Sequence, residues 1–371
     1  MQLLRRGSTG SAVADVRAVL AGLGLLANSD SRAEAVFDEA TELAVRHFQQ
    51  TRGLSVDGIV GVETYAALSG ARWRLGDRVL LHNPASRLVG DDVAALQLQL
   101  LELGYNCGRD DHLFGAVTET ALRNFQRDFG LRVDGVCGPA TLRALKQLAR
   151  RVVGGRPQGL REMVAVASSG PNLPGKRVVI DPGHGGEDLG VVHAELNESA
   201  IVWDLATRLE GRLQAVGVTT WLTRGPQNSR TDEQRADFAN EVGADLLVSL
   251  HVDGAPSDRP HGVASYYYGS AGSISWVGDR LADLAQREIV ARTGMLNARS
   301  HPKTWSLLRL TRMPAVRIDV GYLSSPIDRS MLADPIFRDT VAEGLLIAVQ
   351  RLYLPAESDP PTGVMRIPIG A

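Results

Sequence analysis

The sequence is poor in cysteine, lysine, aromatic residues and long apolar runs, and these shortages exclude several classes of protein. Its 371 residues include two cysteines, Cys107 and Cys137, which are too few for a disulfide framework, so we expect free thiols. No segment reaches the ~18 consecutive apolar residues of a transmembrane helix, so no membrane span is predicted. The N-terminal MQLLRRGSTGSAVADV lacks the apolar core of a secretory signal, which predicts a cytoplasmic protein.

The charge balance argues against a polyanionic partner. The formal net charge is −2, so the chain has no basic surplus and no nucleic-acid partner is predicted. Hydrophobic residues make up 44% and charged residues 22%, which is typical of a globular protein. The length predicts more than one domain.

A repeat occupies the first 150 residues. Residues 44–68 read AVRHFQQTRGLSVDGIVGVETYAAL and residues 121–145 read ALRNFQRDFGLRVDGVCGPATLRAL. Thirteen of these 25 aligned positions are identical at an offset of 77 residues. Such self-similarity predicts two copies of one small module.

Each copy has the same predicted elements. A short apolar helix precedes a second helix that carries Phe48 or Phe125, and a VDG turn follows, where Gly58 or Gly135 can adopt positive φ. The pattern FQ…GL.VDG..G..T...L resembles the peptidoglycan-binding type 1 module, a three-helix domain. The resemblance implies one module at residues 1–70 and another at 75–150.

A different organisation follows the repeat. Residues 151–175 are rich in Gly, Pro and Ser and are predicted to be a linker with one short helix. Residues 176–354 alternate apolar strand segments with amphipathic helices, which predicts an α/β sandwich around a mostly parallel sheet. Residues 355–371 are proline-rich without periodicity, which predicts a mobile tail. The expected strands are RVVIDPG, VTTWLTR, ADLLVSLHVD, GVASYYY and AVRIDVGYL.

The segment DPGHGG, residues 181–186, has two interpretations. A phosphate-binding turn is disfavoured, because the segment matches neither G-x-G-x-x-G nor a Walker A sequence. A metal site is favoured, because His184 ends the first strand and His251 ends the strand DLLVSLH. Sites in such sheets lie at the carboxyl ends of the strands.

A third ligand is needed for a catalytic zinc site, which takes three protein ligands and leaves one position open. Glu198 begins the helix that follows the first strand's loop and completes a His–Glu–His set. Alternatives stay open at this point: Glu195 can replace Glu198, His193 lies in the same loop, and Glu198 can be a first-turn carboxylate that complements the helix dipole.

Five ordered blocks between residues 177 and 353 resemble the zinc-dependent N-acetylmuramoyl-L-alanine amidases of the type 3 family. They are VVIDPGHGGEDLG, NESAIVWDLATRLEGRL, TTWLTR, QRADFANEVGADLLVSLHVD and PAVRIDVGYLSSP. The resemblance implies that His184, Glu198 and His251 bind zinc at the edge of an α/β sandwich. It also implies hydrolysis of the amide between the lactyl group of N-acetylmuramic acid and the L-alanine of the stem peptide.

Two positions depart from the family pattern. The family's catalytic Glu, in a block that reads roughly vEtGFlsN, matches Asp319, and its usual Asn in SIHaN matches Asp253. An Asp withdraws the carboxylate by about 1.5 Å, one C–C bond length. Because a misplacement of about 1 Å can cost ~10²-fold in rate, we expect Asp319 to make a slow hydrolase.

Two main functions follow from these features. One is an active amidase whose modules hold peptidoglycan or muropeptide. The other is a cytoplasmic regulator of peptidoglycan precursor synthesis, because the architecture also resembles an actinobacterial group of signal-less amidase homologues. As a regulator, the chain would bind a precursor-pathway enzyme, and Thr362 in the tail would be a target of a Ser/Thr kinase. Hydrolysis of soluble muropeptides during recycling is a third option.

Overall fold

The structure is a computed structural model that describes residues 3–27, 35–149, 157–270 and 273–367. The chain divides into two compact units, one formed mainly by residues 1–160 and one formed by residues 161–269 and 274–371. The predicted linker lies partly outside the described residues, at 151–156. Its remainder contains the expected short helix, α7 (Pro157–Ser168).

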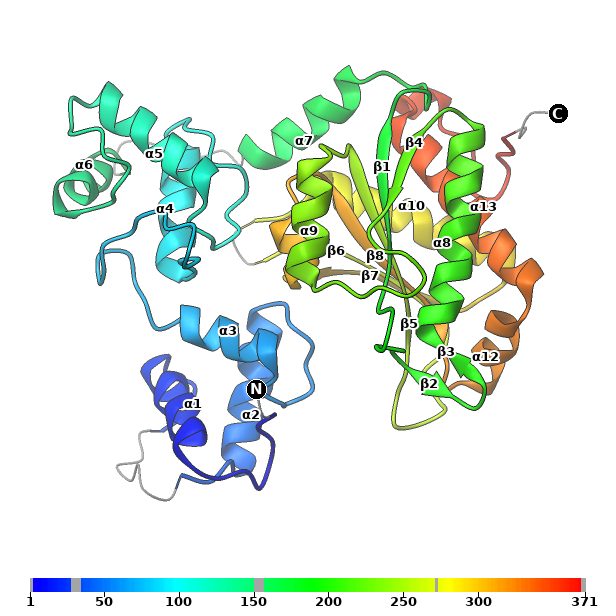
Figure 1. Cartoon of the computed structure of the whole chain (residues 1–371), viewed down its shortest axis with the longest axis horizontal. Helices are drawn as coiled ribbons and strands as arrows, with labels where there is room; N and C mark the ends of the chain where they lie inside the picture. The colour runs from blue at the N-terminus through cyan, green and yellow to red at the C-terminus, as the bar shows by residue number, and fades with distance from the viewer. Residues whose placement is uncertain (1–2, 28–34, 150–156, 271–272, 368–371) are drawn as a thin grey trace. The chain divides into compact units, whose positions relative to one another are not determined.

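The first unit contains two three-helix modules, in agreement with the repeat (Figure 1). Each module has its own apolar core, in which Phe48 and Phe125 are 1% and 0% exposed. The helices of the first module are α1 (Ser11–Gly22), α2 (Glu39–Thr51) and α3 (Val62–Gly70). Those of the second are α4 (Asp91–Glu102), α5 (Ala116–Asp128) and α6 (Pro139–Ala149).

A buried glutamine has the same hydrogen bonds in both modules. The Gln49 amide bonds to Asp57, Ile59, Thr64 and the backbone of Gly58. The Gln126 amide bonds to Asp134, Val136, Thr141 and the backbone of Gly135. These bonds fix the VDG turn against the second helix and the threonine of the third. The identical residues of the repeat therefore build the fold and do not by themselves indicate a ligand.

The second unit is built on a six-stranded sheet with the order β4-β1-β5-β8-β6-β7. All neighbouring strands are parallel except β6 and β8, so the predicted mostly parallel sheet is confirmed. The strands are β1 (Arg177–Pro182), β4 (Thr219–Leu222), β5 (Leu246–Asp253), β6 (Val263–Tyr268), β7 (Asn297–Lys303) and β8 (Ala315–Tyr322).

Strand β7 was not predicted from the sequence. It reads NARSHPK, without apolar alternation, and lies at the edge of the sheet, where an exposed polar strand is stable on one neighbour alone. The central strands are apolar because both of their faces are covered. In β5, for example, seven of eight residues are buried.

Helices cover both faces of the sheet, which makes the unit an α/β sandwich (Figure 1). One face packs against α8 (Glu198–Ala215), α10 (Trp276–Thr293) and α13 (Pro335–Tyr353) in the larger core. The other packs against α9 (Asp232–Glu241) and α11 (Ser306–Leu310) in a smaller core, which includes Val179, Leu247 and Ala315. Helix α12 (Pro326–Ala333) and the hairpin of β2 (Val192–His193) and β3 (Leu196–Asn197) complete the unit.

Among the described residues, no helix combines the length and apolarity needed to cross a bilayer.

Candidate metal centre and active site

The glycine-rich turn after β1 allows close packing of the predicted ligands. A Cβ on Gly183 would clash with the ring of His251, and one on Gly190 would clash with the carboxylate of Glu198. His184 itself has φ of +57°, an uncommon backbone conformation for a residue other than glycine. Arg235 and Arg224 hold this turn by donating hydrogen bonds of 2.9 Å to the carbonyl oxygens of His184 and Gly183. The glycines therefore serve side-chain packing.

Glu198 lies at the centre of the predicted ligand set. It is the first residue of α8, which begins there because the side chain of Asn197 caps the helix by accepting a hydrogen bond from the Ala200 N–H. The Glu198 side chain is buried. Its Oε1 lies 2.8 Å from Nδ1 of His251, and its Oε2 lies 3.2 Å from Nε2 of His184. Burial opposes ionisation, but the two histidines outweigh it and lower the pKa of Glu198.

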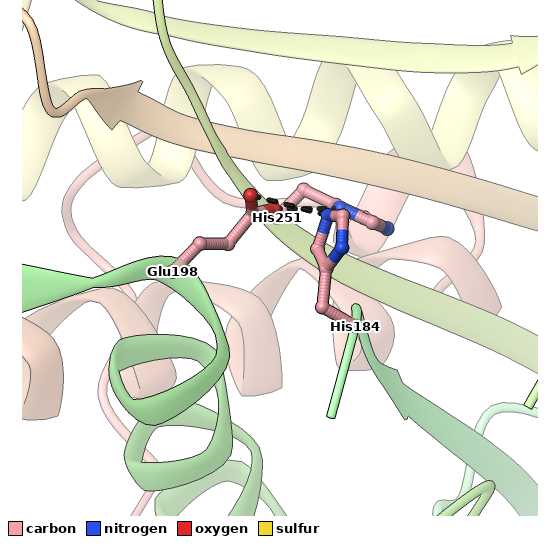
Figure 2. A group of neighbouring side chains, drawn as sticks. All are labelled: His184, Glu198 and His251. Carbon is pink, nitrogen blue, oxygen red and sulfur yellow. Dashed lines mark hydrogen bonds and ion pairs between the residues drawn. The ribbon is translucent and has the colours of Figure 1, made fainter. Parts of the chain in front are cut away.

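His184, Glu198 and His251 each offer a ligand atom, and these atoms lie within 4.8 Å of one another. Figure 2 shows the three side chains converging from the loop after β1, the start of α8 and the end of β5. Two imidazoles and one carboxylate form the donor set of hydrolytic zinc sites. The other ring nitrogen of His184, Nδ1, lies 2.8 Å from Asp188, the type of outer contact that orients a metal-binding histidine. The residues therefore fit a zinc ion.

The alternative ligands lie elsewhere. His193 and Glu195 are exposed on the β2–β3 hairpin, and Nε2 of His193 lies 3.2 Å from the guanidinium of Arg329. Neither belongs to the three-residue group found among the described residues. The sequence alone did not show which of Glu195 and Glu198 lies near the histidines. In the structure, the capped start of α8 directs Glu198 inward, whereas Glu195 is exposed.

Polar side chains form a row across the sheet, on the face covered by α9 and α11. The register places Asp181 of β1 beside Ser249 of β5, Ser249 beside Arg317 of β8, and Arg317 beside Tyr266 of β6. Because side chains alternate along a strand, the residues two positions further on point to the same face. They form a second row, in which His251 lies beside Asp319.

Asp319 is paired with an arginine that the sequence analysis did not single out. Arg317 Nε donates a hydrogen bond of 2.7 Å to Oδ1 of Asp319, and the guanidinium also stacks over the ring of Trp305 at 4.7 Å. The Asp319 side chain is 2% exposed and that of Arg317 is 27% exposed. Burial opposes the charge of Arg317, but the carboxylate outweighs it and raises the pKa of the guanidinium. The sequence contained one indication of this pair, because a charged Arg317 is unusual within the otherwise apolar segment that precedes Asp319.

Asp253, the second departure from the family pattern, lies close to Asp319. Its Oδ1 accepts a hydrogen bond of 2.7 Å from the Gly254 N–H. Burial, and then the charge of Asp319, raise its pKa. The site therefore contains two aspartates in addition to Glu198, with Arg317 as their neighbouring cation.

Asp181 supports the turn that carries His184. This fully buried carboxylate accepts hydrogen bonds from Arg235 at 2.6 Å and from Ser249 at 2.7 Å, and also from Thr223. Burial alone would raise the pKa of Asp181, but Arg235 and the hydroxyls lower it overall. Arg235 thus joins the first strand to the backbone of His184, a role that its place in α9 does not indicate in the sequence.

Thr362 lies in a segment that makes defined contacts. Its hydroxyl accepts a hydrogen bond of 3.1 Å from Arg351 of α13, and Arg351 also pairs with Asp359 and with the buried Glu288 of α10. The Gly363 N–H donates to the same Glu288. The sequence predicted a mobile tail because residues 355–371 lack periodicity. The described part, through residue 367, is instead held by ion pairs and hydrogen bonds to α10 and α13.

Models of two known families match the second unit and the two N-terminal modules. Residues 178–351 match the model described as "N-acetylmuramoyl-L-alanine amidase". Residues 9–68 and 89–145 match the model described as "Putative peptidoglycan binding domain".

Individual relatives agree with these assignments. N-acetylmuramoyl-L-alanine amidase CwlM of Mycobacterium tuberculosis is 49% identical over 372 residues, which span 97% of this chain and 92% of the relative. The germination-specific N-acetylmuramoyl-L-alanine amidase of Bacillus subtilis is 29% identical over 51% of this chain and 84% of its own length. The solved structure of the catalytic domain of the amidase CwlV from Bacillus (Paenibacillus) polymyxa var. colistinus aligns with 47% of this chain and 96% of its own, at 29% identity and a TM-score of 0.44. The chain therefore belongs to the N-acetylmuramoyl-L-alanine amidase family, with two peptidoglycan-binding-type modules ahead of the amidase domain.

Proposed function

We propose that this protein is a zinc-dependent N-acetylmuramoyl-L-alanine amidase that releases the stem peptide from peptidoglycan or a muropeptide. The observation that best supports the proposal is the approach of His184, Glu198 and His251 to within 4.8 Å at the carboxyl edge of the sheet. Zinc bound there would lower the pKa of a water molecule to about 7 and polarise the scissile carbonyl.

The protein's own residues have distinct roles in this proposal. His184, Glu198 and His251 hold the ion, and Asp188 orients the ring of His184. Asp319 is the proton carrier, which takes a proton from the attacking water and delivers it to the leaving amine. Its short side chain and its pairing with Arg317 favour a slow reaction.

The two modules would raise the local concentration of substrate. Weak binding of glycan or stem peptide by two linked modules adds up through effective concentration. The amidase domain could then act on a polymer that it binds weakly by itself.

The test combines metal analysis with a defined substrate. Purified protein should contain about one zinc per chain and release peptide from a muramoyl peptide. Glu198→Ala should lose both properties, whereas the matched control Glu195→Ala should keep both, because Glu195 is exposed on the hairpin. Absence of zinc from the wild-type protein, or equal effects of the two substitutions, would contradict the assignment.

A second function is favoured by the Arg317–Asp319 pair, which engages the predicted proton carrier. In this alternative, the chain regulates peptidoglycan precursor synthesis in the cytoplasm with little catalysis. It would bind a precursor-pathway enzyme and respond to phosphorylation of Thr362 by a Ser/Thr kinase. Zinc without turnover, together with capture of such an enzyme from native lysate, would support this alternative. Absence of phosphate on Thr362 under all growth conditions would contradict the predicted phosphorylation by a kinase.

A further inference from the structure

We propose that Arg317 is a positioning residue that holds the Asp319 carboxylate in an ion pair and thereby lowers the rate of amide hydrolysis. The inference rests on the proposed amidase function, because it concerns the proton carrier of that reaction. Arg317 is not one of the predicted metal ligands and, in this proposal, does not touch the reacting atoms. It acts through Asp319.

Arg317 and Asp319 form a close ion pair on one face of the sheet. Arg317 and Asp319 are two positions apart on β8, so both side chains emerge on the α9/α11 face of the sheet. Arg317 Nε lies 2.7 Å from Oδ1 of Asp319, and Nη2 lies 3.4 Å from Oδ2. Both carboxylate oxygens therefore face the same guanidinium. These charge-assisted hydrogen bonds fix the direction in which the carboxylate faces, so it must turn away from Arg317 to reach a proton on the other side.

The Arg317 side chain is also held by aromatic rings. Trp305 lies under the guanidinium at 4.7 Å, and the ring of Tyr266 lies 4.6 Å from that of Trp305. Tyr266 is also the register partner of Arg317 on β6. An arginine held by an aromatic pair loses little additional freedom when it pairs, so the ion pair is favoured.

The backbone of Asp319 lies beside the predicted metal ligands, but its side chain is not among them. Asp319 is the direct register partner of His251, so its backbone lies one strand spacing away, about 4.8 Å. Nevertheless, its carboxylate is absent from the group of ligand atoms found among the described residues. The backbone of Asp319 thus lies beside that of His251, but its carboxylate is hydrogen-bonded to Arg317. The pairing with Arg317 explains this orientation.

The experiment is a kinetic comparison of wild-type protein, Asp319→Glu, Arg317→Met and the double variant Arg317→Met/Asp319→Glu. If Arg317 restrains the carboxylate, lengthening the side chain alone should help little, because the arginine can pair with either acid. The double variant should show a kcat about tenfold above that of Asp319→Glu, a modest part of the ~10²–10⁴ that a well-placed proton carrier contributes. KM and zinc content should stay within about twofold, since neither Arg317 nor Asp319 belongs to the group of predicted metal ligands. Arg212→Met, which breaks the surface pair with Asp339 on α8 and α13, is the matched control and should leave kcat unchanged.

A second readout does not depend on activity. The Asp319 carboxylate is buried and the Arg317 side chain is partly buried, so removing one member leaves an uncompensated charge, whereas removing both does not. Arg317→Met and Asp319→Asn should therefore each lower the melting temperature, and combining them should recover part of the loss. If Arg317→Met/Asp319→Glu does not fold, Arg317→Lys/Asp319→Glu replaces it in the kinetic test. The lysine ammonium pairs with the acid less rigidly than the guanidinium, so kcat should still rise. The rise should be smaller than with methionine, because the ammonium does not release the acid completely.

The outcomes separate the inference from the proposed function. Hydrolysis that responds to Asp319→Glu but not to loss of Arg317 would overturn the inference and leave the amidase function intact. A rise in kcat with additive melting-temperature losses would also overturn it, because the two side chains would then be energetically independent. Zinc-loaded, folded protein without hydrolysis in any variant would contradict the amidase function, and the inference with it.

Discussion

His251 and Asp319 are direct register partners on the neighbouring parallel strands β5 and β8. Sixty-seven residues of sequence separate them, yet the sheet places a predicted metal ligand and the predicted proton carrier side by side. Glu198, at the start of α8, contacts His251, and Arg317 of β8 contacts Asp319. The site therefore depends on strand register, which offers several direct tests.

Zinc should stabilise the amidase unit. A ligand present at 100 times its dissociation constant stabilises the state that binds it by about 2.7 kcal/mol. Zinc added to metal-free protein should therefore raise the melting temperature of this unit, as measured by differential scanning calorimetry. Glu198→Ala should remove this rise, because Glu198 lies between both histidines. An equal rise in that variant would place the ion elsewhere.

Asp181→Asn should destabilise the amidase unit by about 3–5 kcal/mol, because it leaves the buried Arg235 without its anionic partner. The native state lowers the pKa of Asp181 below the ordinary value of 3.8. Its contribution is therefore complete above about pH 4 and is lost as the pH falls through the native pKa. Urea denaturation at pH 7 and at progressively lower pH should show the gap between wild-type and variant shrinking only below about pH 4. A gap that closes near neutral pH would point to a different group.

Both thiols should be protected in the native protein. Cys107 and Cys137 are buried in the core of the second module. Burial, together with the charge of Asp92, raises the pKa of Cys137 to about 12. Alkylation at pH 8 should therefore be roughly a thousandfold slower for Cys137 than for an ordinary thiol, and both cysteines should react on denaturation. Mass spectrometry of labelled protein measures this directly, and rapid labelling of native Cys137 would contradict its burial.

Gln126→Leu should destabilise the second module by about 3 kcal/mol, because it leaves several buried polar groups without partners. The matched control is Gln147→Ala on the exposed face of α6, which should change stability by less than about 0.5 kcal/mol. Calorimetry of the full chain should assign the loss to one transition. A loss no larger than that of the control would show that the repeated hydrogen bonds contribute little.

Much of the organisation could be predicted from residue order alone. The 77-residue repeat predicted both helical modules, and the apolar strand segments predicted five of the six strands of the main sheet. The three ligand candidates could be named because His184 and His251 end predicted strand segments and Glu198 begins a predicted helix. Strand β7 could not be found, since an edge strand paired on one side needs no apolar alternation.

The sequence by itself determined the periodicities, the module repeat and the residue types available for a metal site, because these depend on short-range order along the chain. Only the tertiary structure placed Glu198 beside both histidines, brought Arg317 onto Asp319 and joined Thr362 to Arg351 by a hydrogen bond. Each of those relationships depends on helix capping, strand register or packing between elements distant in sequence. Hydrogen bonds and ion pairs are effective only over a few ångströms, so such contacts exist only once the chain has folded.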